Sequence, residues 1–286
     1  MPEGDTVWRL AQRLHDALAG RPLTHCDLRV PRLATVDLTG REVSEVVPRG
    51  KHLLTRFEGG LTLHCHLRMD GTWQVYAAGE RWRGGPAHQI RAVLGTAERT
   101  AVGYRLPVLD LLRTADESQV VGHLGPDLLG PEWDPGEALR RLLAAPERPL
   151  GEALLDQRNL AGIGNVYKCE LCFLLRASPW LPIGELPGPE RVPALAKKLL
   201  EANKRRTART TTPWGHRPHP FEGRGGARSD RRLWVYGRAG LPCLRCGGTV
   251  RTSDSGQGPA TDERVTYWCP ACQPGGPDGR SAPPAR

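Results

Sequence analysis

Two Cys-x2-Cys motifs near the C-terminal end of the chain constrain its fold more than any other feature of the sequence. Cys243 and Cys246 form the first pair, Cys269 and Cys272 form the second, and 22 residues separate the pairs. Motifs of this kind hold zinc in tetrahedral thiolate sites, and a β-hairpin takes up extra residues at its tip. Four thiolates form a closed site. The sequence therefore predicts one structural zinc ion on a small zinc-finger hairpin.

The rival interpretations of this array are a redox-active pair and two disulfides. The chain has only 8 cysteines in 286 residues, too few for a disulfide scaffold. Cys169 and Cys172 are also three positions apart, but they lie in a helical pattern with no second pair nearby, so we expect buried free thiols. Cys26 and Cys65 fall in a strand-rich region, and we expect them in the core.

Length and composition exclude several classes of protein. A chain of 286 residues allows about two domains at roughly 150 residues each. No run of eighteen apolar residues occurs, as a membrane-spanning helix requires. Five charged residues lie among the first sixteen positions, where a secretory signal would have its apolar stretch. We therefore expect a soluble cytoplasmic protein that does not bind to a membrane.

The positive charge of the chain is concentrated in one segment. The formal net charge is +9, yet residues 197–251 alone contain fourteen Lys and Arg against three acidic residues. A solvated basic face is the plain interpretation of such a run. Because the whole excess falls in one segment, a nucleic-acid-binding surface is the better one.

Hydrophobic periodicity changes along the chain. Residues 7–18 follow helical spacing, with Asp5 or Thr6 as the cap and Gly20 as the end. Short alternating runs separated by glycines then extend to residue 121, at 52–57, 61–67, 72–76 and 89–94, which is typical of a β-sandwich or barrel. Helical spacing returns at 137–143, 152–157, 166–175 and 192–203.

The first residues carry a possible nucleophile. Removal of Met1 would leave the secondary amine of Pro2 as the terminus, directly beside Glu3. An amine attacks a sugar carbon only when it is neutral, and a terminal amine has a pKa of roughly 7.7–8.0 against about 10.4 for Lys51. Pro2 is thus the readier nucleophile, and the carboxyl of Glu3 can act as its acid–base partner.

Six motifs in order along the chain resemble the formamidopyrimidine-DNA glycosylase/endonuclease VIII family of DNA repair enzymes. The first four residues look most like the endonuclease VIII branch. The motifs are Met1-Pro2-Glu3-Gly4, Arg49-Gly50-Lys51-His52-Leu53-Leu54, His123-Leu124-Gly125-Pro126, Gly162-Ile163-Gly164-Asn165-Val166-Tyr167, Val235-Tyr236-Gly237-Arg238 and Arg264.

The resemblance implies an α+β fold: an N-terminal β-sandwich with flanking helices, then a helical domain with a helix–two-turn–helix and a zinc-finger β-hairpin. We expect the catalytic sandwich at 1–122, the helix–two-turn–helix domain at 123–234 and the zinc finger at 235–273. Residues 274–286 are rich in Pro and Gly, and we expect a disordered tail. The helices of the helix–two-turn–helix are expected at 154–159 and 166–175.

The resemblance also implies the chemistry. Pro2 attacks C1′ of a damaged nucleotide that is flipped out of the duplex, Glu3 acts on the opening sugar, and a Schiff base leads to β,δ-elimination. Lys51, Asn165 and Arg264 match the phosphate-holding positions of the family, with Lys51 and Arg264 also counted as catalytic.

A further implied group fills the gap left by the flipped base. The matching positions are Arg68, Met69 and Asp70, of which the unbranched Met69 is the best candidate for the wedge, with a core methionine as its alternative.

Two departures affect the substrate. The Pro-Arg-Arg-Phe-Gly motif of the formamidopyrimidine branch is replaced by Tyr104-Arg105-Leu106-Pro107, and residues 213–226 do not match a guanine-recognition loop. Both favour oxidised pyrimidines or abasic sites. We therefore expect a monomeric glycosylase and lyase acting on damaged DNA; the alternative is a non-catalytic zinc-finger protein that binds damaged or ordinary duplex.

Overall fold

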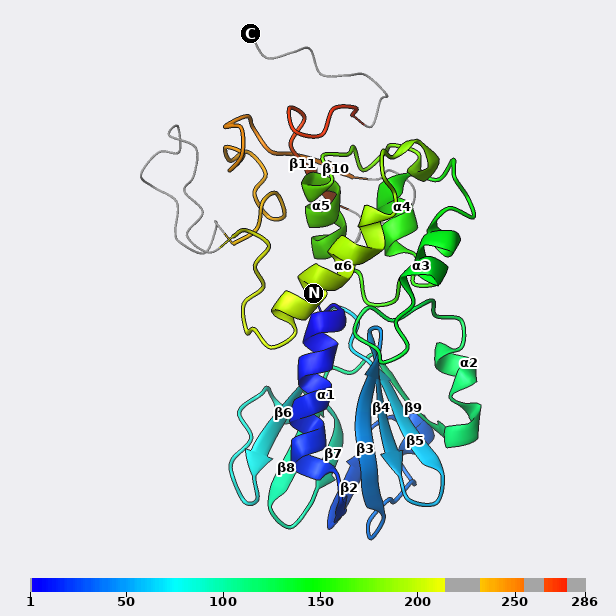
Figure 1. The fold of residues 1–286 in the computed structure, drawn as a ribbon. Coiled ribbons are helices and arrows are strands. Elements are labelled where there is room, and N and C mark those ends of the chain that lie inside the picture. Colours follow the sequence, from blue (N-terminus) through cyan, green and yellow to red (C-terminus); the bar gives the residue numbers. More distant parts are fainter. Residues whose placement is uncertain (1, 214–231, 255–264, 277–286) are drawn as a thin grey trace. The chain divides into compact units, whose positions relative to one another are not determined.

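The computed structural model describes residues 2–213, 232–254 and 265–276. The chain divides into two compact units, Met1–Leu124 and Gly125–Arg286 (Figure 1). Within the described ranges, no helix combines the length and the apolar character that crossing a bilayer requires. The domain boundaries given above, including those of the zinc finger, remain predictions.

The first unit is a β-sandwich of two antiparallel sheets. One sheet has the order β1-β3-β4-β5-β9 and the other the order β2-β7-β8-β6. The strands of the first sheet are β1 (Arg21–Pro22), β3 (Glu42–Arg49), β4 (His52–Phe57), β5 (Leu61–His66) and β9 (Val108–Arg113). Those of the second are β2 (His25–Leu28), β6 (Thr72–Ala77), β7 (Ile90–Gly95) and β8 (Arg99–Tyr104).

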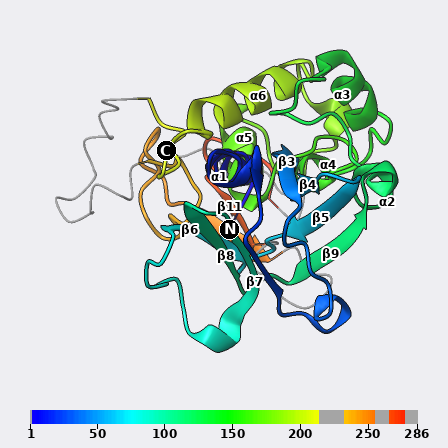
Figure 2. The ribbon, with the colours of Figure 1, turned by 90° about the horizontal axis from the view of Figure 1, so that it is seen from below.

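Helix α1 (Gly4–Leu18) closes one side of the sandwich. Its apolar residues recur at helical spacing, so Val7, Ala11 and Leu14 are all buried in the same core as the facing strands. The helix packs against β3 of one sheet and against β6 and β8 of the other. Figure 2 shows it end-on, with the two sheets on either side. Its N-cap is Glu3, two residues before the expected Asp5 and three before Thr6.

Short helical segments complete the sandwich unit. They connect its strands and lead to the second unit. They are η1 (Pro31–Leu33), η2 (Ala87–Gln89), η3 (Thr114–Asp116) and α2 (Ser118–Val121).

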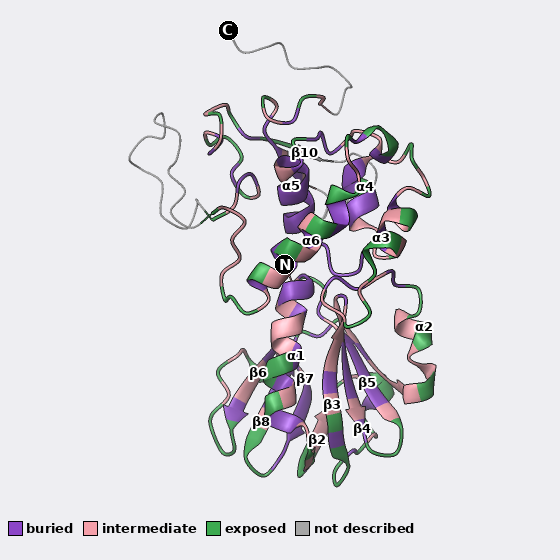
Figure 3. Cartoon of the chain, viewed as in Figure 1, coloured by how far each residue is buried: buried purple, intermediate pink, exposed green. Residues whose placement is uncertain are grey.

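The second unit is helical and carries a two-stranded hairpin. Its elements are α3 (Pro135–Leu142), α4 (Leu150–Leu155), α5 (Asn165–Leu174), η4 (Ile183–Glu185), α6 (Arg191–Asn203), β10 (Arg251–Asp254) and β11 (Val265–Trp268). Helix α5 is buried around its whole circumference from Asn165 to Phe173 (Figure 3). The predicted α+β class, with its sandwich, helical part and cysteine-bearing hairpin, is confirmed.

Helices α4 and α5 flank a double turn, the helix–two-turn–helix arrangement. The expected first helix at 154–159 is wrong, because α4 ends at Leu155 and the chain then turns. The Gln157 side chain holds these turns: its amide donates to the carbonyls of Leu155 (2.8 Å) and Ile163 (2.9 Å), and its oxygen accepts from the Gly162 N–H (3.1 Å). These hydrogen bonds replace the helical ones that were expected.

A fully buried carboxylate joins α5 to the segment before the first cysteine pair. Glu170 accepts the backbone N–H groups of Trp234 (2.8 Å), Val235 (2.9 Å) and Tyr236 (2.9 Å), and the Thr211 hydroxyl also donates to it. Burial raises the pKa of Glu170, while these hydrogen bonds act in the opposite direction. One side chain therefore satisfies three successive backbone donors.

Glu170→Ala should destabilise this unit by roughly 3 kcal/mol, because three backbone N–H groups, of which those of Trp234 and Val235 are buried, lose their acceptor. Urea denaturation followed by tryptophan fluorescence measures the change. Glu201→Ala is the matched control, since Glu201 pairs with Lys197 and Lys204 at the surface of α6. Equal destabilisation by the two variants would contradict the role given to Glu170.

Candidate active site and metal centre

The predicted site residues of the first unit lie at one end of the sandwich, because β3 runs antiparallel to α1. The Gly20 N–H donates to the Val43 carbonyl (2.8 Å) just after the helix, and the Val46 N–H donates to His15 Nδ1 (3.2 Å). Strand β3 therefore runs back along α1, from the end of the helix towards its start. The turn after β3 lies at the same end of the unit as Pro2 and Glu3.

The remaining strands bring two further turns to this end. His66, the last residue of β5, pairs with His52 of β4 and with Val108 of β9. Thr72, the first residue of β6, pairs with Tyr104, the last residue of β8. The connections 67–71 and 105–107 therefore share the end of the sandwich that carries Pro2, Glu3 and Lys51.

Glu3 is held rigidly at the start of α1. Its carbonyl accepts the N–H groups of Thr6 (2.9 Å) and Val7 (3.0 Å), and the residue is completely buried. Pro2, directly before it, is half-buried. The N-terminal end of a helix also favours a negative charge. A buried carboxyl thus lies next to an imino acid in the sequence and at a fixed point of the fold.

Lys51 lies in the two-residue turn between β3 and β4, which the pairing of Arg49 with His52 closes. Gly50 has a φ of 58°, which fits the first central position of a type II′ hairpin turn. The turn makes Lys51 the second central residue, where it is half-buried. The Arg-Gly-Lys-His sequence is therefore a tight hairpin tip that places a lysine.

Met69 is the apex of the β5–β6 connection and has an exposed fraction of 37%. Leu241, at 40%, is the other large apolar side chain that is exposed in the described residues. The alternative of a core methionine is therefore wrong. Its neighbour Arg68 has a φ of 48°, a backbone conformation that residues other than Gly, Asn and Asp rarely adopt.

Four histidines gather beside Lys51, a cluster that was not predicted from the sequence although two of its members, His52 and His123, belong to the family motifs. His52 Nδ1 and His64 Nε2 lie 2.8 Å apart, and the His52 ring also meets His66 (4.8 Å between centroids) and His123 (6.1 Å). A pattern in the sequence could have revealed part of the cluster. His64 and His66 are two positions apart on β5, so their side chains lie on the same face of the strand, and His66 pairs with His52 of β4. Asp110 Oδ2 lies 3.8 Å from His64 Nδ1, and Arg32 bonds its other oxygen.

Three histidines of the cluster, His52, His64 and His66, are held neutral at physiological pH. Burial, and then the neighbouring histidines and Lys51, lower the pKa of His52 to about 3. Burial, followed by Arg68 and Lys51, lowers the pKa of His66 to about 4. Burial also lowers the pKa of His64, against the opposing charge of Asp110. These three histidines therefore add hydrogen-bonding atoms near Lys51 without adding charge.

In the second unit, Asn165 opens helix α5 and is almost fully buried. Its side-chain amide donates to the carbonyl of Val265 at the start of β11 (2.8 Å). Lys168 reaches the same strand through the Thr266 hydroxyl (2.8 Å). Arg264, the residue before Val265 in the sequence, lies outside the described residues. Asn165 and β11 are thus brought together.

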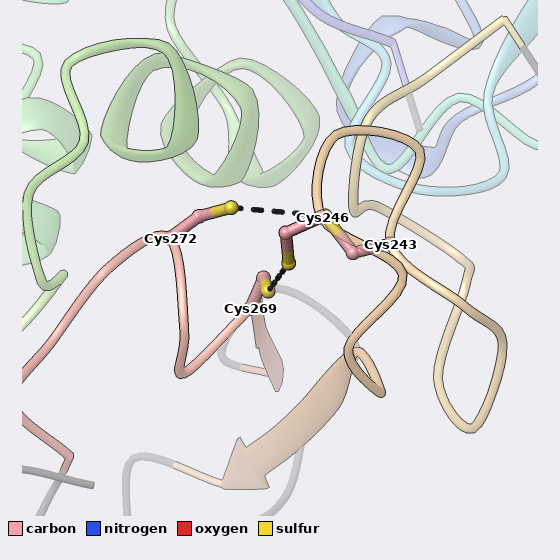
Figure 4. Close-up of side chains that lie close together, drawn as sticks. All are labelled: Cys243, Cys246, Cys269 and Cys272. Carbon is pink, nitrogen blue, oxygen red and sulfur yellow. Dashed lines mark hydrogen bonds between the residues drawn. The ribbon is translucent and has the colours of Figure 1, made fainter. Parts of the chain in front are cut away.

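The sulfur atoms of Cys243, Cys246, Cys269 and Cys272 lie within 4.8 Å of one another and can hold a metal ion (Figure 4). The sulfurs of Cys246 and Cys269 are 3.5 Å apart and those of Cys243 and Cys272 are 3.9 Å apart, well beyond the ~2.05 Å of a disulfide. Four thiols converging from two turns suit tetrahedral coordination.

The other four cysteines are free thiols. Cys169 and Cys172 are buried within α5, as expected. Cys65 is buried in the sandwich core, and Cys26 is half-buried against it.

Comparison with known proteins identifies the family. The model of a family described as "Formamidopyrimidine-DNA glycosylase N-terminal domain" matches residues 1–105. A Streptomyces coelicolor protein named "Probable endonuclease 8 2" is 68% identical over 277 residues, which cover 96% of this chain and 95% of that protein. The chain belongs to the formamidopyrimidine-DNA glycosylase/endonuclease VIII family.

Further relatives place the chain in the endonuclease VIII branch. A Mycolicibacterium smegmatis protein named "DNA-(apurinic or apyrimidinic site) lyase Nei2" is 48% identical over 273 residues, covering 96% of this chain and 99% of that one. The Lactococcus lactis formamidopyrimidine-DNA glycosylase, solved with DNA containing an oxidised pyrimidine, shares the fold. It has a TM-score of 0.74 at 20% identity and covers 95% of this chain and 99% of that chain.

The histidine cluster should make the protein less stable in acid. Because His52 and His66 have folded pKa values of about 3 and about 4, against roughly 6.5 when unfolded, the unfolded chain takes up protons first. The free energy of unfolding then falls as the pH drops from about 6.5 towards about 4, and is unaffected above this range. In His52→Ala, unfolding should take up about one proton fewer.

Urea denaturation between pH 7.5 and pH 4.5 measures this slope. His88→Ala, which removes an exposed histidine of η2, should keep the slope of the unaltered protein. An unchanged slope in His52→Ala would show that His52 binds protons equally in both states.

Proposed function

We propose that this protein is a bifunctional DNA glycosylase and abasic-site lyase of base excision repair, with oxidised pyrimidines as favoured substrates. The observation that carries the proposal is the shared end of the sandwich: buried Glu3 after Pro2, the Lys51 turn and exposed Met69 all lie there. Membership in the endonuclease VIII branch supports the same chemistry.

Pro2 is the proposed nucleophile once Met1 has been removed. Its terminal amine, with an ordinary pKa of roughly 7.7–8.0, is appreciably neutral near pH 7. The N-cap position of Glu3 fixes its backbone at the start of α1, directly after Pro2 in the sequence. An acid–base group within reach of the opening sugar contributes typically ~10²–10⁴-fold to the rate.

The proposed reaction has three stages. The Pro2 nitrogen bonds to C1′, the bond from C1′ to the base breaks, and the base leaves with a proton. Glu3 protonates the ring oxygen as the sugar opens, which leaves an iminium between Pro2 and C1′. The iminium accepts the electron pair released when C2′ loses a proton, and the 3′ phosphate leaves. A second proton is then lost from C4′, the C5′–O bond breaks and the 5′ phosphate leaves, and water hydrolyses the remaining iminium to free Pro2.

Binding groups come from both units. Lys51, Asn165 and Arg264 are the proposed phosphate contacts, and Arg264 precedes the strand that Asn165 holds. The N-terminal end of α5 and the glycines before it suit an approaching phosphate. Met69, with Arg68 beside it, is proposed to fill the stack when the damaged nucleotide is flipped out.

Preference for pyrimidines rests on the β8–β9 turn. The residues between these strands are Arg105, Leu106 and Pro107, a connection too short for the Pro-Arg-Arg-Phe-Gly motif of the formamidopyrimidine branch. We therefore propose that the favoured substrate is a duplex with an oxidised pyrimidine, and that abasic sites are also processed.

The proposed metal is one structural zinc ion on the zinc finger. Four thiolates leave no open coordination position for substrate. The ion would hold together a small cluster that includes Phe173, Trp234 and Val250, and its loss would release the strand that Asn165 binds.

Borohydride trapping tests the proposed function. Protein whose intact mass shows that Met1 is absent should form a covalent complex with duplexes containing an oxidised pyrimidine or an abasic site. Pro2→Gly should lose most of this trapping, and Glu3→Gln should release the base ~10²-fold or more slowly. Denaturing gels measure both results.

Glu98→Gln is the matched control, because Glu98 lies in the β7–β8 turn, at the far end of the sandwich, and is mostly exposed. Binding of damaged or ordinary duplex without trapping or cleavage would instead indicate the non-catalytic DNA-binding protein.

Metal analysis tests the zinc ion. Purified protein should contain about one zinc per chain, and Cys269→Ser should lose it together with most DNA binding. Cys26→Ser, which alters a half-buried thiol of the other unit, should retain both. Full DNA affinity in metal-free protein would contradict a structural zinc.

A further inference from the structure

We infer that Arg105 is a positioning residue that fixes the Met69 turn and acts on DNA through Met69. The inference rests on the proposed function, since it assigns the wedge a support. Arg105 lies in the β8–β9 connection, thirty-six positions after Met69 in the sequence, and the register of the strands brings the two turns to one end of the sandwich.

The Met69 turn is closed by its own backbone. The Gly71 N–H donates to the Leu67 carbonyl (2.9 Å), and the Arg68 N–H donates to His66 Nδ1 (3.1 Å). A side chain at Gly71 would lie 2.7 Å from the Leu67 carbonyl oxygen, so this position admits glycine alone. The low pKa of His66 keeps Nδ1 available as an acceptor at neutral pH.

Arg105 ties this turn to a second segment. Its Nε donates to the carbonyl of Asp70 (3.2 Å), one residue after Met69. Its Nη1 donates to Gln89 Oε1 (2.8 Å), and its backbone N–H donates to the Gln89 carbonyl (2.7 Å). One residue therefore links the β5–β6 turn, the end of η2 and its own turn.

The backbone of Arg105 is specialised for this link. Its φ of 50° lies in the left-handed region, which an arginine adopts only where its surroundings hold it there. The neighbouring Tyr104 and Leu106 are buried, so the turn is anchored on both sides. The guanidinium is consequently presented at a fixed position.

A wedge benefits from such support. To fill the base stack, the apolar side chain must lie at the level of the flipped-out base. If the turn were disordered before binding, ordering it would consume part of the binding free energy. With Arg105 in place the turn is already ordered. The effect is confined to duplex substrates, because a single strand has no stack to fill.

A comparison of duplex and single-stranded substrates tests the inference. Arg105→Ala should lower kcat/KM on a duplex with an oxidised pyrimidine by about three- to tenfold, as expected for loss of an ordinary, solvent-exposed hydrogen bond. Activity on a single-stranded oligonucleotide with the same lesion should stay unchanged. Met69→Ala should show the same selectivity.

The double variant separates positioning from direct contact. If Arg105 acts through Met69, Met69→Ala/Arg105→Ala loses no more activity on duplex than Met69→Ala alone. The slope of log affinity against log salt should also stay unchanged, whereas loss of a phosphate contact reduces it by about 1. Additive losses, a reduced slope or equal losses on single strands would overturn the inference.

Controls keep the outcome separate from that of the proposed function. Arg99→Ala removes the same charge from the opposite end of β8 and should leave both activities intact. Equal thermal midpoints for all variants exclude unfolding. If the unaltered protein neither traps nor cleaves DNA, the proposed function fails; if it is active and Arg105→Ala keeps full duplex activity, only the role of Arg105 fails.

Discussion

The candidate site depends on the register between α1 and β3. Two hydrogen bonds fix it: one from Val46 to the ring of His15, and one from Gly20 to Val43. A slip of one residue would turn the buried faces of β3 outward, because alternate side chains of a strand point to opposite sides. The same slip would move the Lys51 turn relative to Glu3. The core that packs α1 on β3 thus also determines which residues share the end of the sandwich.

Much of this organisation could be predicted from the sequence. Strand β4 has the expected bounds, 52–57, because its apolar run ends at a glycine pair. The metal site could be predicted because the two cysteine pairs have the short, fixed spacing that metal ligands need. The family resemblance supplied Pro2, Glu3 and Asn165 as candidates, and the fold gives each a defined place.

What the sequence could not reveal are hydrogen bonds between a side chain and backbone groups far away in the chain. Glu170 looks like one more polar residue of a helix, yet it accepts backbone donors some 64 positions away. Arg105 looks like a surface charge of a short turn, and its partner Asp70 is 35 positions away. The prediction of the first helix of the double turn failed for a local reason: the Gln157 side chain donates to the carbonyls of Leu155 and Ile163 and holds the chain in turns after α4.

In the basic segment 197–251, the number of Lys and Arg residues is larger than the number of cations that the surface offers to DNA. Arg238 is buried, with an exposed fraction of 3%. The guanidinium of Arg245 lies 4.1 Å from the centre of the Phe173 ring and bonds the Phe173 carbonyl, and Lys197 donates to the Leu128 carbonyl. Cations used in this way stabilise the second unit by packing and hydrogen bonds. The number of charges that can meet phosphates is therefore smaller than the fourteen in the sequence, and the attraction to DNA scales with that smaller number.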